Sequence, residues 1–179
     1  MNCILKCIHS GSEEIIRLNE INHTSFLDNE LTEINDLFES ERNSEIIGIY
    51  INGVIVGFFF VRSYKEICYI GYFAIAPEHR GKGIGGKALK LLAEYYSNKQ
   101  LVVEIEAVDE KAHNNYSRIR RKNFYLKNGF VPTNWHLFYD EVELEILCSG
   151  ADFKKNEFNE LSDYIHSLYY DSIPKLYQK

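Results

Sequence analysis

One stretch of sequence decides the fold of this chain, namely Tyr72-Phe-Ala-Ile-Ala-Pro-Glu-His-Arg80-Gly-Lys-Gly-Ile-Gly-Gly-Lys87. Its first residues are apolar and typical of a strand, and its glycine-rich second half opens a segment with helical periodicity. Glycines let backbone N–H groups approach an oxyanion closely, and a helix N-terminus adds partial positive charge. Arg80 and Lys82 add full charges. We therefore interpret Arg80–Gly86 as an anion-binding loop rather than a simple chain reversal.

Three phosphate-binding patterns compete for this loop. The segment Gly81–Gly86 satisfies the dinucleotide pattern GxGxxG, and Glu104 and Glu106 supply acids ~20 residues further on. That pattern belongs at the first strand of a parallel βαβ unit, however, whereas a hairpin and two helices are predicted to come first here. The segment Gly81–Lys87 nearly satisfies the nucleotide loop GxxxxGK[ST], but Ala88 stands where that loop needs a hydroxyl for magnesium. Both patterns therefore fit less well than a third.

The rest of the chain predicts strands and helices in mixed order. We expect strands at Cys3–Ile8, Glu45–Ile51, Val54–Arg62, Cys68–Ile75, Leu101–Val108, Phe130–Val131 and Glu141–Leu147. We expect helices beginning near Ser12, at Leu31–Glu39, from the glycine loop to about Asn98 with Tyr95 on its apolar face, at Tyr116–Lys127 and at Asn156–Tyr169. Asn52-Gly53 predicts a type I′ hairpin turn, and Gly129 predicts a left-handed helix cap.

Length and composition indicate one soluble domain covering residues 1–179. The hydrophobic share of 45% and charged share of 26% are near those of globular proteins. A net charge of −6 argues against nucleic acid as a partner, because phosphate binding needs a concentrated basic surface. An acidic balance suits a cationic substrate, although many proteins are acidic without binding one.

The four cysteines do not form a metal-binding pattern. No CxxC pair occurs, so no metal site is expected, and buried reduced thiols are the favoured interpretation. The N-terminus lacks the apolar core of a signal peptide, and no segment reaches membrane-spanning length. The sequence therefore predicts a cytoplasmic protein that does not bind a membrane.

The third pattern is a resemblance to a known family. The spacing Arg80-x-x-Gly83-x-Gly85 resembles the coenzyme A pyrophosphate loop of the GNAT superfamily of N-acyltransferases, and Phe124-Tyr125-Leu-Lys-Asn-Gly129-Phe130 resembles that family's second landmark. The resemblance covers about residues 45–131 by motif and the remainder by element order. It implies an α/β fold with a mixed, mostly antiparallel central sheet of about seven strands flanked by helices, in which strands four and five are parallel and splayed.

The resemblance also implies where acetyl-CoA binds. The pyrophosphate would lie on the loop, whose residues are Arg80, Gly81, Lys82, Gly83, Ile84, Gly85 and Gly86. The pantetheine arm would occupy the gap between strands four and five and bond to main-chain groups at Phe73, Ala74 and Ile75. A backbone N–H near Phe73 would polarise the thioester carbonyl as an oxyanion donor does. The side chains at these three positions could equally be core.

In this family an amine attacks the thioester directly, which assigns Tyr125 the role of general acid for the departing thiolate. A base or water chain must first deprotonate the amine, whose pKa is ~10. Glu104 and Glu106 alternate along one strand and project from one face about 7 Å apart. They are candidate bases, or they form a salt bridge with the Arg118–Arg121 helix. Gly71 replaces an acid and Arg118 an asparagine found in relatives, so the base stays unassigned.

The sequence therefore predicts an N-acetyltransferase that uses acetyl-CoA and a primary amine on a small molecule or peptide. The alternative is a non-catalytic module of the same fold that binds acyl-CoA as a sensor. Neither the acceptor nor the acyl chain can be named from sequence. The C-terminal strand and helix could support a homodimer.

Overall fold

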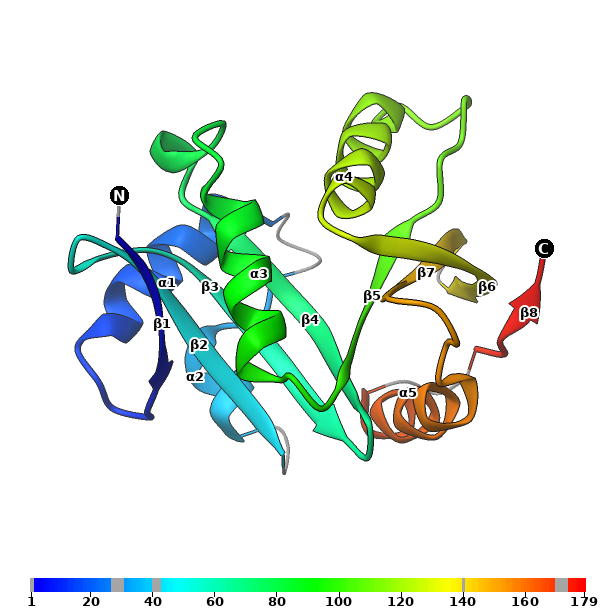
Figure 1. Cartoon of the computed structure of the whole chain (residues 1–179), viewed down its shortest axis with the longest axis horizontal. Helices are drawn as coiled ribbons and strands as arrows, with labels where there is room; N and C mark the ends of the chain where they lie inside the picture. The colour runs from blue at the N-terminus through cyan, green and yellow to red at the C-terminus, as the bar shows by residue number, and fades with distance from the viewer. Residues whose placement is uncertain (1, 27–30, 40–42, 140, 170–173) are drawn as a thin grey trace. The chain divides into compact units, whose positions relative to one another are not determined.

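A computed structural model describes residues 2–26, 31–39, 43–139, 141–169 and 174–179 (Figure 1). The chain divides into two compact units, Met1–Ser63 with Ile70–Tyr96 and Tyr64–Tyr69 with Ser97–Lys179. The elements of the first unit are β1 (Cys3–Ile8), α1 (Glu14–His23), α2 (Ile34–Glu39), β2 (Ser44–Ile51), β3 (Val54–Tyr64), β4 (Ile67–Ile75), the 3₁₀ turn η1 (Pro77–His79) and α3 (Ile84–Tyr95). The last residue of β3 and the first residues of β4 belong to the second unit.

The turn between β2 and β3 is the one that the sequence predicts. Asn52 and Gly53 both have positive φ angles, 50° and 85°, as a type I′ turn requires. The turn pairs Ile51 with Val54 and sets an antiparallel register, which shifts once at a bulge between Ile49 and Tyr50. Local turn chemistry therefore fixes this hairpin.

Both faces of β2 and β3 are buried, which explains their nearly continuous apolar sequences. On one face Phe58 and Phe60 pack with α1 and α2 in one apolar cluster. Phe59 points to the opposite face because side chains alternate along a strand. On that opposite face the Tyr96 hydroxyl, just past α3, donates a hydrogen bond to Glu45 of β2. Helices therefore lie on both faces of this part of the sheet.

The apolar face of α3 differs in one residue from the prediction. The helix buries Ile84, Ala88, Leu89 and Leu92. The prediction that Tyr95 belongs to this face is wrong, since its side chain is 56% exposed and its ring packs edge-on against Tyr96. Tyr96 is the buried residue of this pair, four residues after the buried Leu92, so the core contact is made one position later than predicted.

The second unit combines antiparallel strands with two helices. Its elements are β5 (Gln100–Glu106), α4 (Asn115–Lys127), β6 (Phe130–Tyr139), β7 (Val142–Ser149), α5 (Lys155–Tyr169) and β8 (Tyr177–Gln178). Strand β7 pairs antiparallel with both β5 and β6. Phe158 and Leu161 of α5 pack against Val102 of β5 and Ile146 of β7 in the core of this unit.

Strand β6 is longer than predicted, and β8 was not predicted. The sequence indicates a strand only at Phe130–Val131, whereas β6 continues to Tyr139 through a register shift between Pro132 and His136. Strand β8 pairs antiparallel with β6. Its attachment is strengthened by Glu143, which accepts hydrogen bonds from the Tyr177 hydroxyl and from Lys179 Nζ.

In the described part of the chain, the strands form one eight-stranded sheet with the order β1-β2-β3-β4-β5-β7-β6-β8. Strand β4 runs parallel to β5, and their pairing covers Ile67–Tyr69 opposite Gln100–Val102. This is the mixed, mostly antiparallel sheet that was expected, with its fourth and fifth strands parallel. The strand beyond the expected seven is the two-residue β8.

Two of the four cysteines are buried as expected. Cys68 and Cys148 lie in the core, and burial raises the pKa of Cys148 to about 11. Cys7 is exposed, so the expectation of buried thiols is wrong at this position. None of the described helices is long and apolar enough to cross a membrane.

Candidate active site

The predicted anion-binding loop connects η1 to α3. Gly81 and Gly83 have φ angles of 73° and 74°, in the left-handed region that residues with a Cβ rarely adopt. A Cβ placed on either glycine would meet no atom within 4 Å. Backbone conformation, rather than lack of space, therefore requires glycine here. The open space beside both residues is available to a ligand.

The N-terminus of α3 completes this loop. Gly83 is the N-cap residue, and the first helical bond is donated by the Lys87 amide to the Gly83 carbonyl. The amides that precede Lys87 have no acceptor within the helix. Among the described residues no side chain caps them, and the first turn carries no acidic residue. The helix end therefore presents N–H groups and positive dipole to an anion.

Two basic side chains flank the loop. Arg80 is exposed, and it donates from Nε to the Ile75 carbonyl at 2.8 Å and from Nη2 to Ser25 Oγ at 2.9 Å. Lys82 Nζ donates to the Glu78 carbonyl at 2.7 Å. These contacts go to uncharged oxygens, so both cations keep their charge available to a ligand at the loop.

The three β4 positions assigned to the pantetheine arm lie immediately before this loop. Phe73 stacks on Phe59 with ring centroids 4.2 Å apart, and Ala74 is buried. The carbonyl of Ala74 lies so close to β3 that a Cβ on Gly57 would approach it to 2.4 Å. The side chains at Phe73 and Ala74 therefore serve packing, and a ligand could use only the main chain. Through Ile75 this segment is bonded directly to Arg80.

Tyr125 is the residue of α4 that is buried, with 5% of its surface exposed. Its ring packs edge-on against Phe124 and Phe130, at centroid distances of 5.3 and 5.1 Å. Burial raises the pKa of Tyr125 well above its usual range, and the charge of Arg121 lowers it only in part. The phenol is therefore protonated at neutral pH, as a general acid must be. Gly129, with a φ of 85°, ends the helix as predicted.

Glu106 forms the salt bridge that was weighed against a catalytic role. Its two carboxylate oxygens lie 2.8 Å from Arg118 Nη2 and 2.9 Å from Arg121 Nη1, and Asn114 Nδ2 donates to it at 3.0 Å. Burial raises the pKa of Glu106. The hydrogen bonds from Asn114 and Arg121 and the two guanidinium charges lower this pKa by more than burial raises it, so the net shift is downward. A carboxylate held in this way is a weak proton acceptor.

Glu104 has a different environment, although it is on the same strand face by alternation. It is partly buried and lines a small pocket with Tyr69 of β4 and with residues of α5. Its partner across the sheet is Ile146 of β7. The structure therefore gives the two candidate bases different surroundings. Residues of α4 form ion pairs with Glu106, whereas Glu104 lies beside α5.

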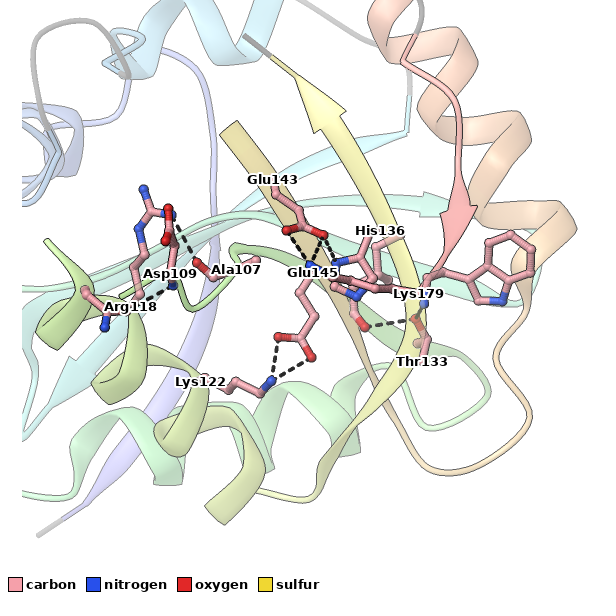
Figure 2. A network of polar contacts seen from close by, with 12 residues as sticks. Ala107, Asp109, Arg118, Lys122, Thr133, His136, Glu143, Glu145 and Lys179 are labelled. Atoms are coloured by element: carbon pink, nitrogen blue, oxygen red, sulfur yellow. Dashed lines mark hydrogen bonds and ion pairs between the residues drawn. The ribbon is translucent and has the colours of Figure 1, made fainter. Parts of the chain in front are cut away.

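Sequence reasoning missed a buried ion pair between α4 and β7. Lys122 Nζ lies 2.9 and 2.7 Å from the two oxygens of Glu145, whose side chain is almost completely buried (Figure 2). Figure 2 also shows Arg118 donating to the carbonyl of Ala107, the residue that follows β5, so α4 is held to the end of this strand as well. The sequence signal for the pair is Glu145, an acidic residue with apolar neighbours on both sides in β7. The pair holds the helix that carries Tyr125.

The family model described as the Acetyltransferase (GNAT) family matches residues 15–130. The chain belongs to this family. The matched range of this GNAT chain includes the loop, Tyr125 and both glutamates, and it excludes α5 and most of β6. The two sequence landmarks therefore lie inside the matched range, whereas α5 and most of β6 lie beyond it.

Solved structures share the GNAT fold. A protein from Bacteroides thetaiotaomicron, described as a GNAT-family acetyltransferase, is 20% identical with a TM-score of 0.76, covering 94% of this chain and 99% of that one. A GNAT acetyltransferase from Elizabethkingia anophelis, solved with acetyl-CoA bound, is 18% identical with a TM-score of 0.57, covering 84% of this chain and 99% of that one.

A sequence relative is known over a short region. The Caenorhabditis elegans protein F36G3.2, which has no assigned function, is 34% identical over 58 residues. The match spans 32% of this GNAT chain and 18% of that protein, so the chain corresponds to less than a fifth of that relative's length.

Proposed function

We propose that this chain transfers an acetyl group from acetyl-CoA to a primary amine on a small molecule or peptide. The observation that carries the proposal is the junction of η1 and α3, where left-handed glycines and uncapped helix amides face open space. Family membership, and acetyl-CoA bound to a protein of the same fold, support coenzyme A as the anion.

The residues present at the junction fit this ligand. A diphosphate carries charge that suits the amides of Gly83–Gly86 and the side chains of Arg80 and Lys82. The open space beside Gly81 and Gly83 admits phosphate oxygens that a Cβ would exclude. The main chain of Phe73–Ile75 would bond to the amide groups of the pantetheine arm, and an N–H near Phe73 would polarise the thioester carbonyl.

Glu104 is the better of the two candidate bases. Acetyl-CoA supplies the thioester carbonyl that an uncharged amine nitrogen attacks, so a C–N bond forms as the C–S bond breaks. Glu104, directly or through water, would take the proton from the ammonium before attack. Glu106 is less suited because two guanidinium groups stabilise its charged form and lower its proton affinity.

Tyr125 would return a proton at the end of the reaction. Its hydroxyl would protonate the coenzyme A thiolate that leaves as the C–S bond breaks, which gives a neutral thiol. Burial by Phe124 and Phe130 keeps the phenol in its acid form. The nitrogen loses a second proton as the amide forms, and this proton would return to the Tyr125 phenolate through solvent. The net products are then the amide, the free thiol and the one proton that Glu104 took and passes to solvent.

One observation favours a second candidate, an acyl-CoA sensor without catalysis. Tyr125 is so deeply buried that its hydroxyl can be a packing feature of α4 rather than an acid. A sensor would bind acetyl-CoA at the same loop but would not release coenzyme A faster when an amine is added. Turnover with a panel of amines separates the two functions.

Ligand-dependent stability tests the proposed coenzyme. Acetyl-CoA at about 100 times its dissociation constant should raise the free energy of unfolding by ~2.7 kcal/mol. ATP and NAD should produce little change at the same concentration. Equal stabilisation by ATP would reject the coenzyme assignment. Release of coenzyme A thiol in the presence of polyamines, aminoglycosides or peptide N-termini would then identify the acceptor.

Gly83→Val tests the position of the diphosphate. The added side chain would project into the open space beside the loop and strain a left-handed backbone, so acetyl-CoA binding should be lost. Gly53→Val is the matched control, since Gly53 also has positive φ and open space but lies in the β2–β3 turn. Both variants should lose stability, whereas only the first should lose coenzyme binding, as measured by calorimetry. Binding retained by Gly83→Val would contradict the assigned site.

A further inference from the structure

Strand β1 forms one end of the sheet and belongs to the first unit. In the described part of the chain it pairs with β2 alone, and Figure 1 shows these two strands side by side. Of its six residues only Ile8 is buried. The strand at the other end of the sheet, β8, has two residues. Short edge strands discourage pairing with another chain, whereas a longer apolar edge such as β1 is a template for it.

The β2–β3 hairpin determines which backbone groups of β1 point away from the sheet. Ile51 and Val54 close the two-residue turn, so the N–H and C=O of Ile51 point toward β3. Cys3, the partner of Ile51 in β1, therefore has its own N–H and C=O on the side away from β2. The Asn52 amide donates to the Asn2 carbonyl at 3.1 Å. The groups of Asn2 thus point to β2, as alternation along the strand requires.

The same alternation places the backbone groups of Cys3, Leu5 and Cys7 at the open edge. Their side chains share one face of β1, while Ile4 and Ile8 on the other face pack in the cluster with α1 and α2. Cys3 and Leu5 are partly exposed and Cys7 is exposed. The edge therefore combines hydrogen-bonding groups with a row of apolar side chains that a second strand would cover.

We propose that two copies of this chain pair through β1, antiparallel and about a two-fold axis at Leu5. Leu5 lies midway between Cys3 and Cys7, so in this register it faces its own copy and each cysteine faces the other cysteine of the second copy. All three outward-facing residues then donate and accept a backbone bond. A register shifted by two residues would leave Cys3 or Cys7 without a partner in β1. The inference does not depend on the proposed function.

Lys6 is the charged residue of β1, and edge lysines commonly oppose such pairing. Its Nζ lies 4.9 Å from the centre of the Tyr50 ring of β2, so this side chain is directed back over its own sheet. In the proposed register Lys6 faces Ile4 of the second copy rather than a second lysine. A six-residue strand is only about 20 Å long, and small interfaces belong to weak complexes, so the dimer should dissociate in the micromolar range.

Disulfide trapping tests the register. Residues opposed in a hydrogen-bonded antiparallel pair have Cα atoms about 5.5 Å apart, within the range of about 4.4–6.8 Å that a disulfide spans. The oxidant is oxidised glutathione, used at alkaline pH because partial desolvation raises the pKa of both thiols. Each Cys3–Cys7 bond releases two protons and two electrons, which reduce the reagent to two thiols. The unmodified protein should give a disulfide-linked dimer on non-reducing electrophoresis.

Two single variants make the trap specific to this register. Cys3→Ser and Cys7→Ser should each fail to cross-link alone, because the remaining cysteines of the two copies lie four residues apart, about 13 Å. An equimolar mixture of the two variants should cross-link, since it restores one contact between Cys7 and Cys3. Cross-linking of Cys3→Ser alone would reveal random collisions of exposed Cys7 thiols. That result, or a mixture that does not cross-link, would overturn the pairing.

Sedimentation velocity under reducing conditions tests the association itself. The unmodified protein should pass from monomer to dimer across the micromolar range. Leu5→Lys places two like charges opposite each other on the axis and should raise the dimer dissociation constant by about ten-fold or more. Val54→Lys is the control, because Val54 is 61% exposed at the start of β3, and it should leave this constant unchanged. A protein that stays monomeric, or a dimer that Leu5→Lys does not weaken, would overturn the proposal.

Discussion

Tyr125 illustrates how burial decides the role of a single group. Phe124 and Phe130 remove its ring from water and raise the pKa of its hydroxyl, so the phenol holds its proton throughout the neutral range. A thiolate has an ordinary pKa of ~8.5, so proton transfer from the buried phenol to it would be uphill. Catalysis by Tyr125 therefore requires that bound coenzyme lower this cost.

Replacing Tyr125 with phenylalanine should separate catalysis from binding. If the hydroxyl is the acid, Tyr125→Phe should lower kcat by about 10²-fold, within the range for a general acid, and leave acetyl-CoA affinity unchanged. Tyr116→Phe is the control, because Tyr116 is on the same helix and is 73% exposed. Steady-state kinetics and calorimetry make the comparison. An unchanged kcat would remove Tyr125 from the mechanism and favour the sensor.

Glu106 should contribute to stability in a pH-dependent way. Its pKa is lowered in the folded protein, so its contribution is fully present above the ordinary value of 4.5 and is lost as pH falls through the folded pKa. Glu106 and Arg118 are only 18% and 11% exposed. Glu106→Gln should therefore lower the free energy of unfolding at pH 7 by about 2 kcal/mol. On acidification the variant should lose less of its unfolding free energy than the unmodified protein does.

Urea unfolding at pH 7 and near pH 3.5 measures this difference. Glu160→Gln is the control, since Glu160 pairs with Lys65 at an exposed site where an ion pair contributes little. If Glu106→Gln and the unmodified protein lost stability in parallel on acidification, the ion pair would not be the source.

At the scale of elements, the close approach of β3 to β4 depends on Gly57. A Cβ at this position would lie 2.4 Å from the Ala74 carbonyl and 2.8 Å from the Ile75 side chain. Gly57→Ala should therefore push the strands apart at a cost of about 1–3 kcal/mol. It should also weaken acetyl-CoA binding, because the displaced backbone is the segment assigned to the pantetheine arm.

The control for this change is Gly48→Ala in β2. Its Cβ would meet only side-chain ends, at 2.9 Å from Ile8 and Tyr50, which can shift. Thermal unfolding should show destabilisation in both variants, and calorimetry should show weaker acetyl-CoA binding only for Gly57→Ala. A Gly57→Ala protein with unaltered affinity would place the arm elsewhere.

Elements specified by local chemistry could be predicted from the sequence. Asn52-Gly53 predicts the β2–β3 turn, and Gly129 predicts the end of α4, because both need a left-handed backbone. Strand β6 was predicted too short because Pro132 and a register shift interrupt the alternating pattern. The two-residue β8 exists through its pairing with Trp135 and His136, which no local pattern encodes.

The same distinction applies to the candidate site. The loop at Arg80–Gly86 follows from spacing, since the glycines and the helix start are neighbours in sequence. Alternation predicts that Glu104 and Glu106 share a face, but not that α4 binds Glu106 while α5 adjoins Glu104. Such partners are distant in sequence, so their choice depends on tertiary packing.

At the scale of the whole molecule, the chain passes repeatedly between its two compact units. The chain enters the second unit at Tyr64, returns to the first unit at Ile70 and enters the second unit again at Ser97. Strands β3 and β4 therefore each have residues in both units. We propose that residues 1–179 are one GNAT domain that unfolds in a single transition, since neither unit is a continuous segment.

Two spectroscopic probes test this proposal. Trp135 is the single tryptophan, it lies in the second unit, and Lys155 Nζ is 4.0 Å from its ring. Its fluorescence therefore reports on that unit, whereas far-UV circular dichroism reports on helices of both. The two urea midpoints should coincide. Separate midpoints would show that the units unfold independently.

The exposed Cys7 thiol affects how turnover is measured. Colorimetric reagents that detect released coenzyme A would also label Cys7, which adds a background to the signal. Partial desolvation by neighbouring protein atoms and the nearby Glu45 charge raise the pKa of this exposed thiol, so labelling should be slow and could be mistaken for weak activity. A Cys7→Ser protein would remove this drift, and chromatographic detection of the acetylated product would avoid it.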